Sequence, residues 1–213
     1  MWRLALLLLA SAATGCHYPA LPELMHGDAG EDSVSIDAGD ASVDATPDAP
    51  HVCYTPLDIG GATLGTAGSP IVSEWFNTPT SGPNAGKKEF VVSAQLDQTS
   101  PTDVLAFVVA RPTGGFVANQ AYAFATDATP NLPYSALALM YGDFVTATTT
   151  YQQYLFAANG SVTFSQIGET SNSMITGTMN PTDFREVNEA TGAVIPNGCT
   201  TRIGTVTFYL REQ

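Results

Sequence analysis

The sequence has few positive charges and no histidine beyond residue 51. Its 213 residues hold seven Lys and Arg against twenty Asp and Glu, and the three histidines are His17, His26 and His51. The lack of histidine over residues 53–213 excludes a Ser-His-Asp triad, a Cys-His pair and His-ligated zinc from that stretch. No cluster of cations larger than Lys87-Lys88 is present, so we expect no nucleic-acid partner.

No hydrophobic run is long enough to cross a membrane. The apolar residues Leu4–Leu9 follow Arg3 and lead through small residues to Cys16, which is the order of parts in an export signal. A span of roughly 30 Å of hydrocarbon needs about 20 apolar residues, many more than this run supplies. We therefore predict that residues 1–15 are a signal peptide and not a retained transmembrane helix.

The end of this segment, Ser11-Ala12-Ala13-Thr14-Gly15-Cys16, resembles a lipobox. In a lipobox, small residues precede a cysteine that is diacylated and becomes the new N-terminus; Ala13 stands where leucine is usual. The resemblance implies that Cys16 is lipidated and that the mature protein is a bacterial lipoprotein held at a bilayer. His17, in place of the aspartate associated with inner-membrane retention, favours the outer membrane. The alternative is an ordinary secretory signal, which leaves Cys16 as a free thiol or removes it.

Basic residues are missing from the next segment too. Residues 17–50 contain eight acidic side chains and no Lys or Arg, mixed with Ala, Gly, Ser and Pro. The apolar surface of this segment is too small to offset the conformational entropy lost on ordering the chain. We therefore predict a disordered linker over residues 16–52. Repulsion among its carboxylates extends such a linker. Cation binding by the acidic repeats is the alternative.

Residues 53–213 form one domain, which we predict to be all-β. Phe90–Leu96 alternate between apolar and polar residues, Val104–Ala110 are continuously apolar, and Asn159-Gly160 is a hairpin signal. The pattern predicts an antiparallel β-sandwich or jelly roll of about nine or ten short strands. The remaining strands are expected over residues 122–126, 134–141, 144–149, 151–157, 161–164, 174–179, 184–187 and 205–210.

Only two cysteines remain once Cys16 is assigned to lipid. Cys53 opens the domain and Cys199 lies just before its last predicted strand. In an oxidising compartment such a pair predicts one disulfide that closes the domain. Two unpaired thiols, or a two-cysteine metal site without further ligands, are the alternatives.

Carboxylates are the remaining candidates for catalysis, as a pair of the glycosidase type. Their spacing singles out no pair among Glu74, Asp97, Asp103, Asp127, Asp143, Glu169 and Glu186. The segments 97–103 and 180–183 carry oxygen ligands that suit Ca²⁺, but without regular spacing, so we interpret both as turns. We predict no catalytic residue, no metal and no cofactor. A secreted carboxylate-dependent hydrolase, for example a glycan-active one, remains the alternative.

Aromatic side chains are the other candidates for a site. Trp75 together with Tyr134 or Tyr151 has the residue types of a platform on which sugar rings stack. Aromatic residues also build β-sheet cores, and packing is the alternative interpretation for all three.

The C-terminal third carries a resemblance to a family. The segments are Gly160-Ser161-Val162-Thr163-Phe164, then Gly177-Thr178, then Phe184-Arg185-Glu186-Val187, and finally Gly198-Cys199-Thr200-Thr201. Their order resembles an uncharacterised family of secreted bacterial β-domains, often lipoproteins behind Asp/Ala-rich linkers. The resemblance covers about 100 residues, its motifs are structural, and it implies no activity.

Taken together, these features predict a membrane-anchored lipoprotein of the cell envelope. We expect its β-domain to be a non-catalytic binding or structural module, with the lipid bilayer as one partner and a glycan or an envelope protein as another.

Overall fold

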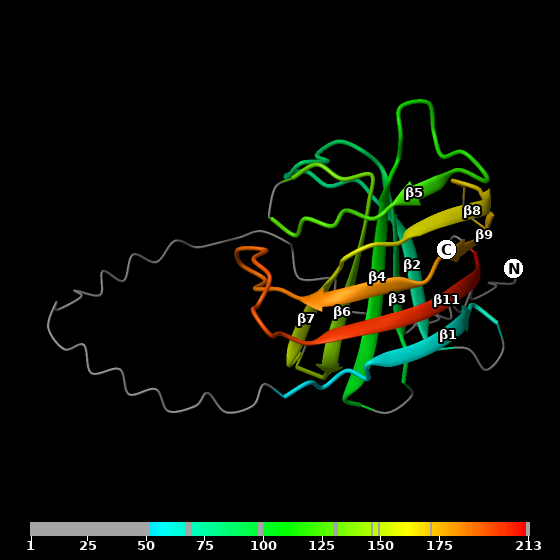
Figure 1. The fold of residues 1–213 in the computed structure, drawn as a ribbon. Coiled ribbons are helices and arrows are strands. Elements are labelled where there is room, and N and C mark those ends of the chain that lie inside the picture. Colours follow the sequence, from blue (N-terminus) through cyan, green and yellow to red (C-terminus); the bar gives the residue numbers. More distant parts are fainter. Residues whose placement is uncertain are drawn as a thin grey trace, which may run out of the picture.

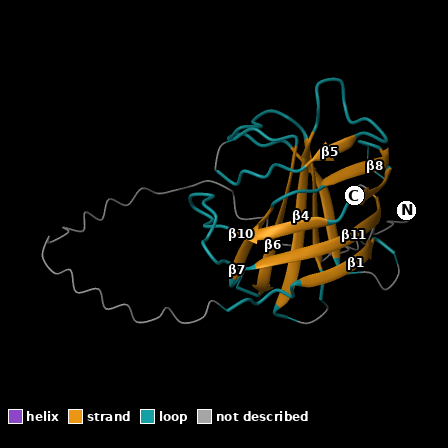
Figure 2. Ribbon diagram, in the orientation of Figure 1, coloured by secondary structure: helices purple, strands orange, loops and turns teal. Residues whose placement is uncertain are grey.

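The computed structural model describes residues 52–66, 70–97, 100–129, 132–145, 147–148, 150–170 and 172–211. In these ranges the chain forms eleven strands and no helix (Figures 1 and 2), so the all-β prediction is confirmed. The predicted signal peptide, the acylation site Cys16 and the linker as far as residue 51 lie outside the described residues.

All eleven strands belong to one continuous sheet that folds over into two layers. The first layer contains β2 (Val72–Asn77), β3 (Glu89–Gln95), β4 (Thr102–Ala110), β6 (Ala136–Phe144) and β7 (Gln153–Ala157), in that spatial order. The second contains β1 (Asp58–Leu64), β11 (Thr200–Arg211), β9 (Met174–Met179), β8 (Ser161–Ile167) and β5 (Ala121–Ala123). Figure 1 shows β11 and β1 running across β3, β4 and β6.

One strand, β10 (Thr182–Glu186), joins the two layers. It pairs with β7 on one side and with the first residues of β11 on the other. Strand β9 pairs with the second half of β11, so β9 and β10 follow each other along the same edge. Every pairing of named strands is antiparallel except that of β1 with β11, which is parallel.

The main core lies between the layers. Phe90 and Phe107 from the first layer meet Phe164 and Phe208 from the second, with ring centroids 5.6–5.9 Å apart. Each buried phenylalanine contributes about 2–3 kcal/mol to the free energy of folding, so this four-ring contact is a major tie between the layers. All nine residues of β4 are buried, as the continuous apolar run predicts for a strand covered on both faces.

The structure corrects the predicted strands in two places. It has eleven strands, because β1 and β2 were not expected: β1 contains Gly60 and Gly61 and pairs with two register shifts, which hides its alternation. The strand expected over residues 144–149 is not formed. Phe144 ends β6, Val145 and Thr150 form an isolated bridge, and a turn lies between them.

The hairpin expected at Asn159-Gly160 is also not formed, because β7 and β8 are not neighbours. The Asn159 side chain accepts a hydrogen bond from the Asp183 N–H (2.9 Å) and donates one to Oδ2 of Asp183 (2.5 Å). Gly160 has a φ of 100° and packs against Thr182. These contacts to β10 turn the chain from the first layer into the second, where β8 pairs with β9.

Candidate functional site

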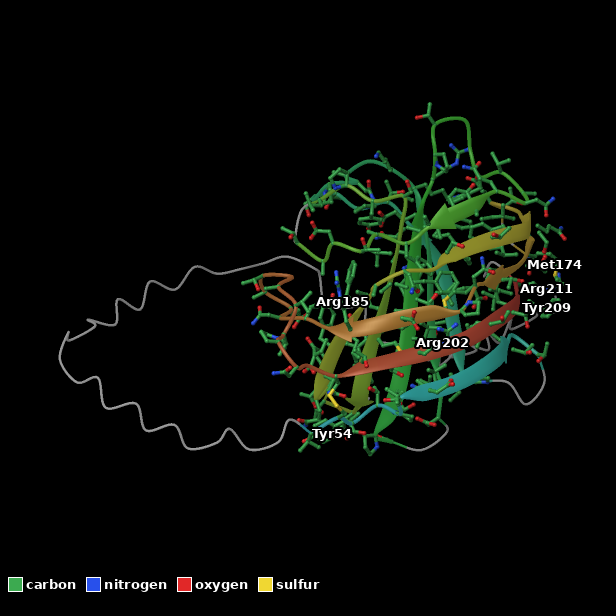
Figure 3. The ribbon with its side chains drawn as sticks, viewed as in Figure 1. Tyr54, Met174, Arg185, Arg202, Tyr209 and Arg211 are labelled. Carbon is green, nitrogen blue, oxygen red and sulfur yellow. A yellow bond between two sulfur atoms is a disulfide. The ribbon has the colours of Figure 1, made fainter. Side chains whose placement is uncertain are left out.

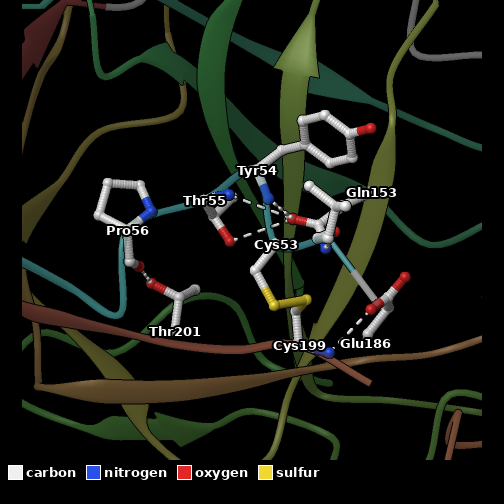
Figure 4. The surroundings of a disulfide bond; sticks show 9 residues. Cys53, Tyr54, Thr55, Pro56, Gln153, Glu186, Cys199 and Thr201 are labelled. Atoms are coloured by element: carbon white, nitrogen blue, oxygen red, sulfur yellow. Dashed lines mark hydrogen bonds between the residues drawn. A yellow bond between two sulfur atoms is a disulfide. The ribbon is translucent and has the colours of Figure 1, made fainter. Parts of the chain in front are cut away.

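The chain enters the domain at a disulfide. Cys53 and Cys199 are bonded across 146 residues, with Cα atoms 5.6 Å apart (Figure 4), so the predicted bridge is present. The backbone N–H of Cys199 donates to the carboxylate of buried Glu186 at 2.8 Å. The bridge therefore fastens the start of the domain to the segment between β10 and β11.

A buried glutamine fixes the same entry segment. Oε1 of Gln153, on β7, accepts hydrogen bonds from the backbone N–H groups of Tyr54 (2.8 Å) and Thr55 (3.1 Å). The Thr201 hydroxyl on β11 donates to the carbonyl of Pro56 (Figure 4). No sequence pattern marks Gln153 as a site residue, because its partners lie 98 and 99 residues earlier in the chain.

The predicted aromatic residues lie on the outer face of the first layer, away from the main core. That face carries a second apolar cluster, here called the outer cluster. Its members are Val91, Val104, Val108, Leu137, Leu139, Tyr141, Tyr154, Phe156 and Val187. Trp75, Tyr134 and Tyr151 are all partly buried and pack against it. The structure therefore brings all three to one face of the sheet.

Their spacing along that face separates Tyr134 from Tyr151. Tyr134 lies two residues before β6, and Tyr141 lies on β6, seven residues after Tyr134. The Tyr151 ring packs against Tyr141, with the ring centroids 4.9 Å apart, so it lies near the far end of the strand. A strand rises roughly 3.3 Å per residue, so about 20 Å separate the two positions. Trp75 lies opposite Val91 on the edge strand β2. The three rings therefore mark the margins of the outer cluster and do not form one continuous platform.

Tyr134 is held by a buried polar network. Its hydroxyl donates to Oε1 of Glu89 at 2.8 Å, and the Asn84 amide donates to the same oxygen at 3.1 Å. Both partners are buried. Burial, and then the hydrogen bond and charge of Glu89, raise the pKa of the Tyr134 hydroxyl above its usual value. Tyr134 is therefore a neutral, positioned side chain.

Tyr151 belongs to a group of three tyrosines. Its ring contacts those of Tyr141 and Tyr154, with centroids 4.9 and 6.2 Å away, and its hydroxyl donates to Glu189. Burial is the main cause that raises the pKa of all three hydroxyls above their usual value. The group stays uncharged and apolar in character at physiological pH. Glu189 was not singled out from the sequence.

The candidate carboxylates separate into two sets. Glu169 binds Nε of Arg111 at 2.9 Å and Nζ of Lys88 at 3.5 Å, an ion-pair group that links the layers. Asp183 binds Arg202 at 3.1 Å. Asp127 caps a turn by accepting from the Thr129 N–H at 2.9 Å. These groups have structural partners.

Asp103 is different, since it is buried beside two other carboxylates. Its N–H donates to Asp97, and its Oδ1 accepts from the backbone N–H of Asp143 at 3.4 Å. Burial raises the pKa of Asp103 to about 6. The hydrogen bond from the Asp143 N–H lowers this pKa, and the charges of Asp97 and Asp143 raise it further. Asp103 therefore titrates closer to neutrality than an ordinary carboxylate.

Among the described residues, no group of three or more His, Cys, Asp or Glu side chains is placed to hold a metal ion. No helix of the described part is long and apolar enough to span a membrane. No protein-family model, curated protein or solved structure matches the chain, so its resemblance to a family of secreted β-domains stays a prediction.

Proposed function

We propose that this chain is a lipid-anchored protein of the bacterial cell envelope, in the outer membrane, whose β-domain is a non-catalytic binding module. The observation that carries the proposal is the way the chain enters the domain. The segment that follows the expected acylation site Cys16 reaches Cys53, where the disulfide and Gln153 fasten it. Such a fastening gives a domain displayed on a linker a fixed attachment point.

The binding partner in this proposal is a glycan or an envelope protein. Trp75, Tyr134 and Tyr151 are the proposed contact residues, because they are partly exposed aromatic rings at the margins of an apolar face. Aromatic residues are enriched where proteins bind partners, since they bury a large area at little entropic cost. Positioned rings such as Tyr134, held by Glu89, keep that cost low.

Fractionation of cells that express the full chain tests the anchor. We expect the wild type in the outer-membrane fraction and Cys16→Ala as unprocessed or soluble protein. The matched control Ser11→Ala changes the same segment but keeps the cysteine, and should fractionate as the wild type does. If Cys16→Ala partitions as the wild type does, the lipoprotein proposal is wrong.

One observation favours a second function. At Asp103, burial raises the pKa of a carboxyl to about 6 beside two further carboxylates, which is the kind of environment that acid–base hydrolases use for a general acid. A panel of glycoside and ester substrates tests it with the full chain. Turnover that disappears in both Asp103→Asn and Asp143→Asn, but persists in Asp58→Asn, would establish the hydrolase and overturn the non-catalytic proposal.

A further inference from the structure

An open pocket of about 450 Å³ lies at the end of β11 and is lined in part by β2, the strand that also carries Trp75. It is lined by Gly65, Thr66, Pro70, Val72, Glu74, Met174, Tyr209, Leu210 and Arg211. Small-molecule sites usually occupy roughly 300–1,000 Å³, so the pocket has room for one or two sugar rings. Its lining comes from residues that follow β1 or precede β2, from β2 itself, from the start of β9 and from the end of β11.

The pocket combines an exposed ring with groups that form hydrogen bonds. Tyr209 is 50% exposed. Met174 and Arg211 face each other in register, and Figure 3 shows both beside Tyr209 at one edge of the molecule. Arg211 donates to the carbonyl of Asn172 at 3.3 Å, which orients its guanidinium. Glu74 completes the lining with one negative charge against the positive charge of Arg211.

Next to the pocket, the outer face of the second layer carries many side-chain hydroxyl groups; it is here called the hydroxyl face. Thr207 on β11 lies opposite Thr63 on β1 and Thr178 on β9, and Thr178 lies opposite Thr163 on β8. Neighbouring strands are about 4.8 Å apart, so these four threonines form a regular row. Thr63 and Thr207 share a hydrogen bond at 3.2 Å.

A second row runs beside the first and reaches the pocket. Tyr209 lies opposite Thr176, whose hydroxyl is 2.8 Å from that of Ser165 on β8. Over β8, β9 and residues 205–209, none of the described residues is charged. This surface offers hydroxyl and methyl groups without the cations that anionic polymers and phospholipid headgroups require.

We propose that the pocket binds one sugar residue of an uncharged glycan, and that the hydroxyl face holds the residues that follow it. The exposed Tyr209 ring stacks on the apolar face of a sugar, while Arg211 and Glu74 bond its hydroxyl groups. The opposite charges of this pair leave the lining close to neutral. Residues 53–213 carry twelve Asp and Glu against six Lys and Arg, a negative balance that disfavours an acidic polysaccharide as the ligand.

The position of the pocket suits a tethered domain. Cys199 precedes the first residue of β11 and Arg211 is its last, so the twelve residues of the strand separate the disulfide from the pocket. At roughly 3.3 Å per residue that is about 40 Å. The inference deepens the proposed function and rests on it, because it names a ligand class and a surface for the binding module.

The test is affinity electrophoresis of the full chain, in a detergent without a sugar headgroup, through gels that contain a neutral glucan, a neutral mannan or an anionic alginate. We expect retardation by at least one neutral polysaccharide and not by alginate. Tyr209→Ala and Thr178→Glu should each weaken that binding at least tenfold. Thr113→Glu, which places the same charge on an exposed loop, should bind as the wild type does. An unchanged thermal midpoint in each variant shows that the fold is retained.

The arms of this experiment separate the new site from the proposed function. Binding that is lost in Trp75→Ala but kept in Tyr209→Ala would overturn the pocket and leave a binding module that uses the aromatic margins. Retardation by alginate alone, or by none of the three polymers, would overturn the glycan ligand. The cell fractionation of Cys16→Ala decides the anchor independently of either result.

Discussion

At the scale of single residues, the buried carboxyl of Asp103 has the clearest consequence for stability. It lies where β4 begins and β6 ends, with a pKa raised to about 6, chiefly by burial. A pKa that is higher in the folded than in the unfolded chain stabilises the fold at low pH. This contribution is fully present below about pH 4 and is lost as the pH rises through about 6.

Replacing Asp103 with asparagine removes this titration and keeps an oxygen that accepts from the Asp143 N–H. A shift of about two pKa units corresponds to roughly 3 kcal/mol at most. We expect Asp103→Asn to raise the free energy of unfolding by about 1–3 kcal/mol at pH 7.5 and to change it little at pH 4, in urea titrations at both values. Asp58→Asn is the control for the loss of one negative charge. Equal gains in both variants would argue against a special role for Asp103.

Residue patterns predicted some of the candidate site and missed the rest. The disulfide was predictable because only one pair of cysteines remains once Cys16 is assigned to lipid. The aromatic residues could be named from their type, whereas their spacing depends on the order β2-β3-β4-β6-β7, which no local pattern contains. The pocket at Tyr209 and Arg211 was missed for the same reason, since β2, β9, β11 and the residues that follow β1 meet there from distant parts of the chain.

At the scale of elements, hydrophobic patterns located most strands but not their partners. Strand β3 lies close to its predicted position because alternation marks it, and β4 because a continuous apolar run does; β9 has the predicted bounds. Strands β1 and β2 lack such a pattern: β1 has two central glycines, and every residue of β2 but the last is only partly buried. A local turn signal at Asn159-Gly160 did not produce a hairpin, because contacts with β10 decide the direction of the chain there.

That corner gives a prediction with a built-in control. A Cβ on Gly160 would lie 2.2 Å from Oγ1 of the buried Thr182, whereas a Cβ on Gly82 would meet nothing within 4 Å. Both glycines have positive φ, 100° for Gly160 and 82° for Gly82, so alanine strains the backbone at both positions. We expect Gly82→Ala to cost about 1 kcal/mol and Gly160→Ala about 3 kcal/mol or more, measured by urea unfolding. Equal costs would contradict the close packing of this corner.

At the scale of the whole molecule, one covalent bond joins the two ends of the domain. The Cys53–Cys199 bridge closes a loop of 146 residues, which corresponds to roughly 5 kcal/mol in the chain-entropy model. We expect the double variant Cys53→Ala/Cys199→Ala to lose about 3–5 kcal/mol of unfolding free energy relative to the oxidised wild type. A non-reduced digest of the wild type should contain the two peptides linked. Two alkylatable thiols in freshly purified protein from an oxidising compartment would contradict the bridge.

The arrangement of the whole chain gives the binding module its setting. A linker of the predicted composition has an r.m.s. length of roughly 30 Å when flexible, and charge repulsion lengthens it. The linker would end at the disulfide, and the pocket lies about 40 Å further along β11. A ligand at the pocket would then be met well away from the headgroups of the bilayer.

The intact mass of the full-length gene product, extracted from membranes with detergent, tests the central claim most directly. The account predicts a mature chain that begins at Cys16 and carries the added mass of a diacylglycerol group, with the Cys53–Cys199 disulfide intact. A chain that retains residues 1–15, or one that begins nearby with a free thiol or no cysteine at its start, would contradict the proposal that this β-domain is held at a membrane by lipid.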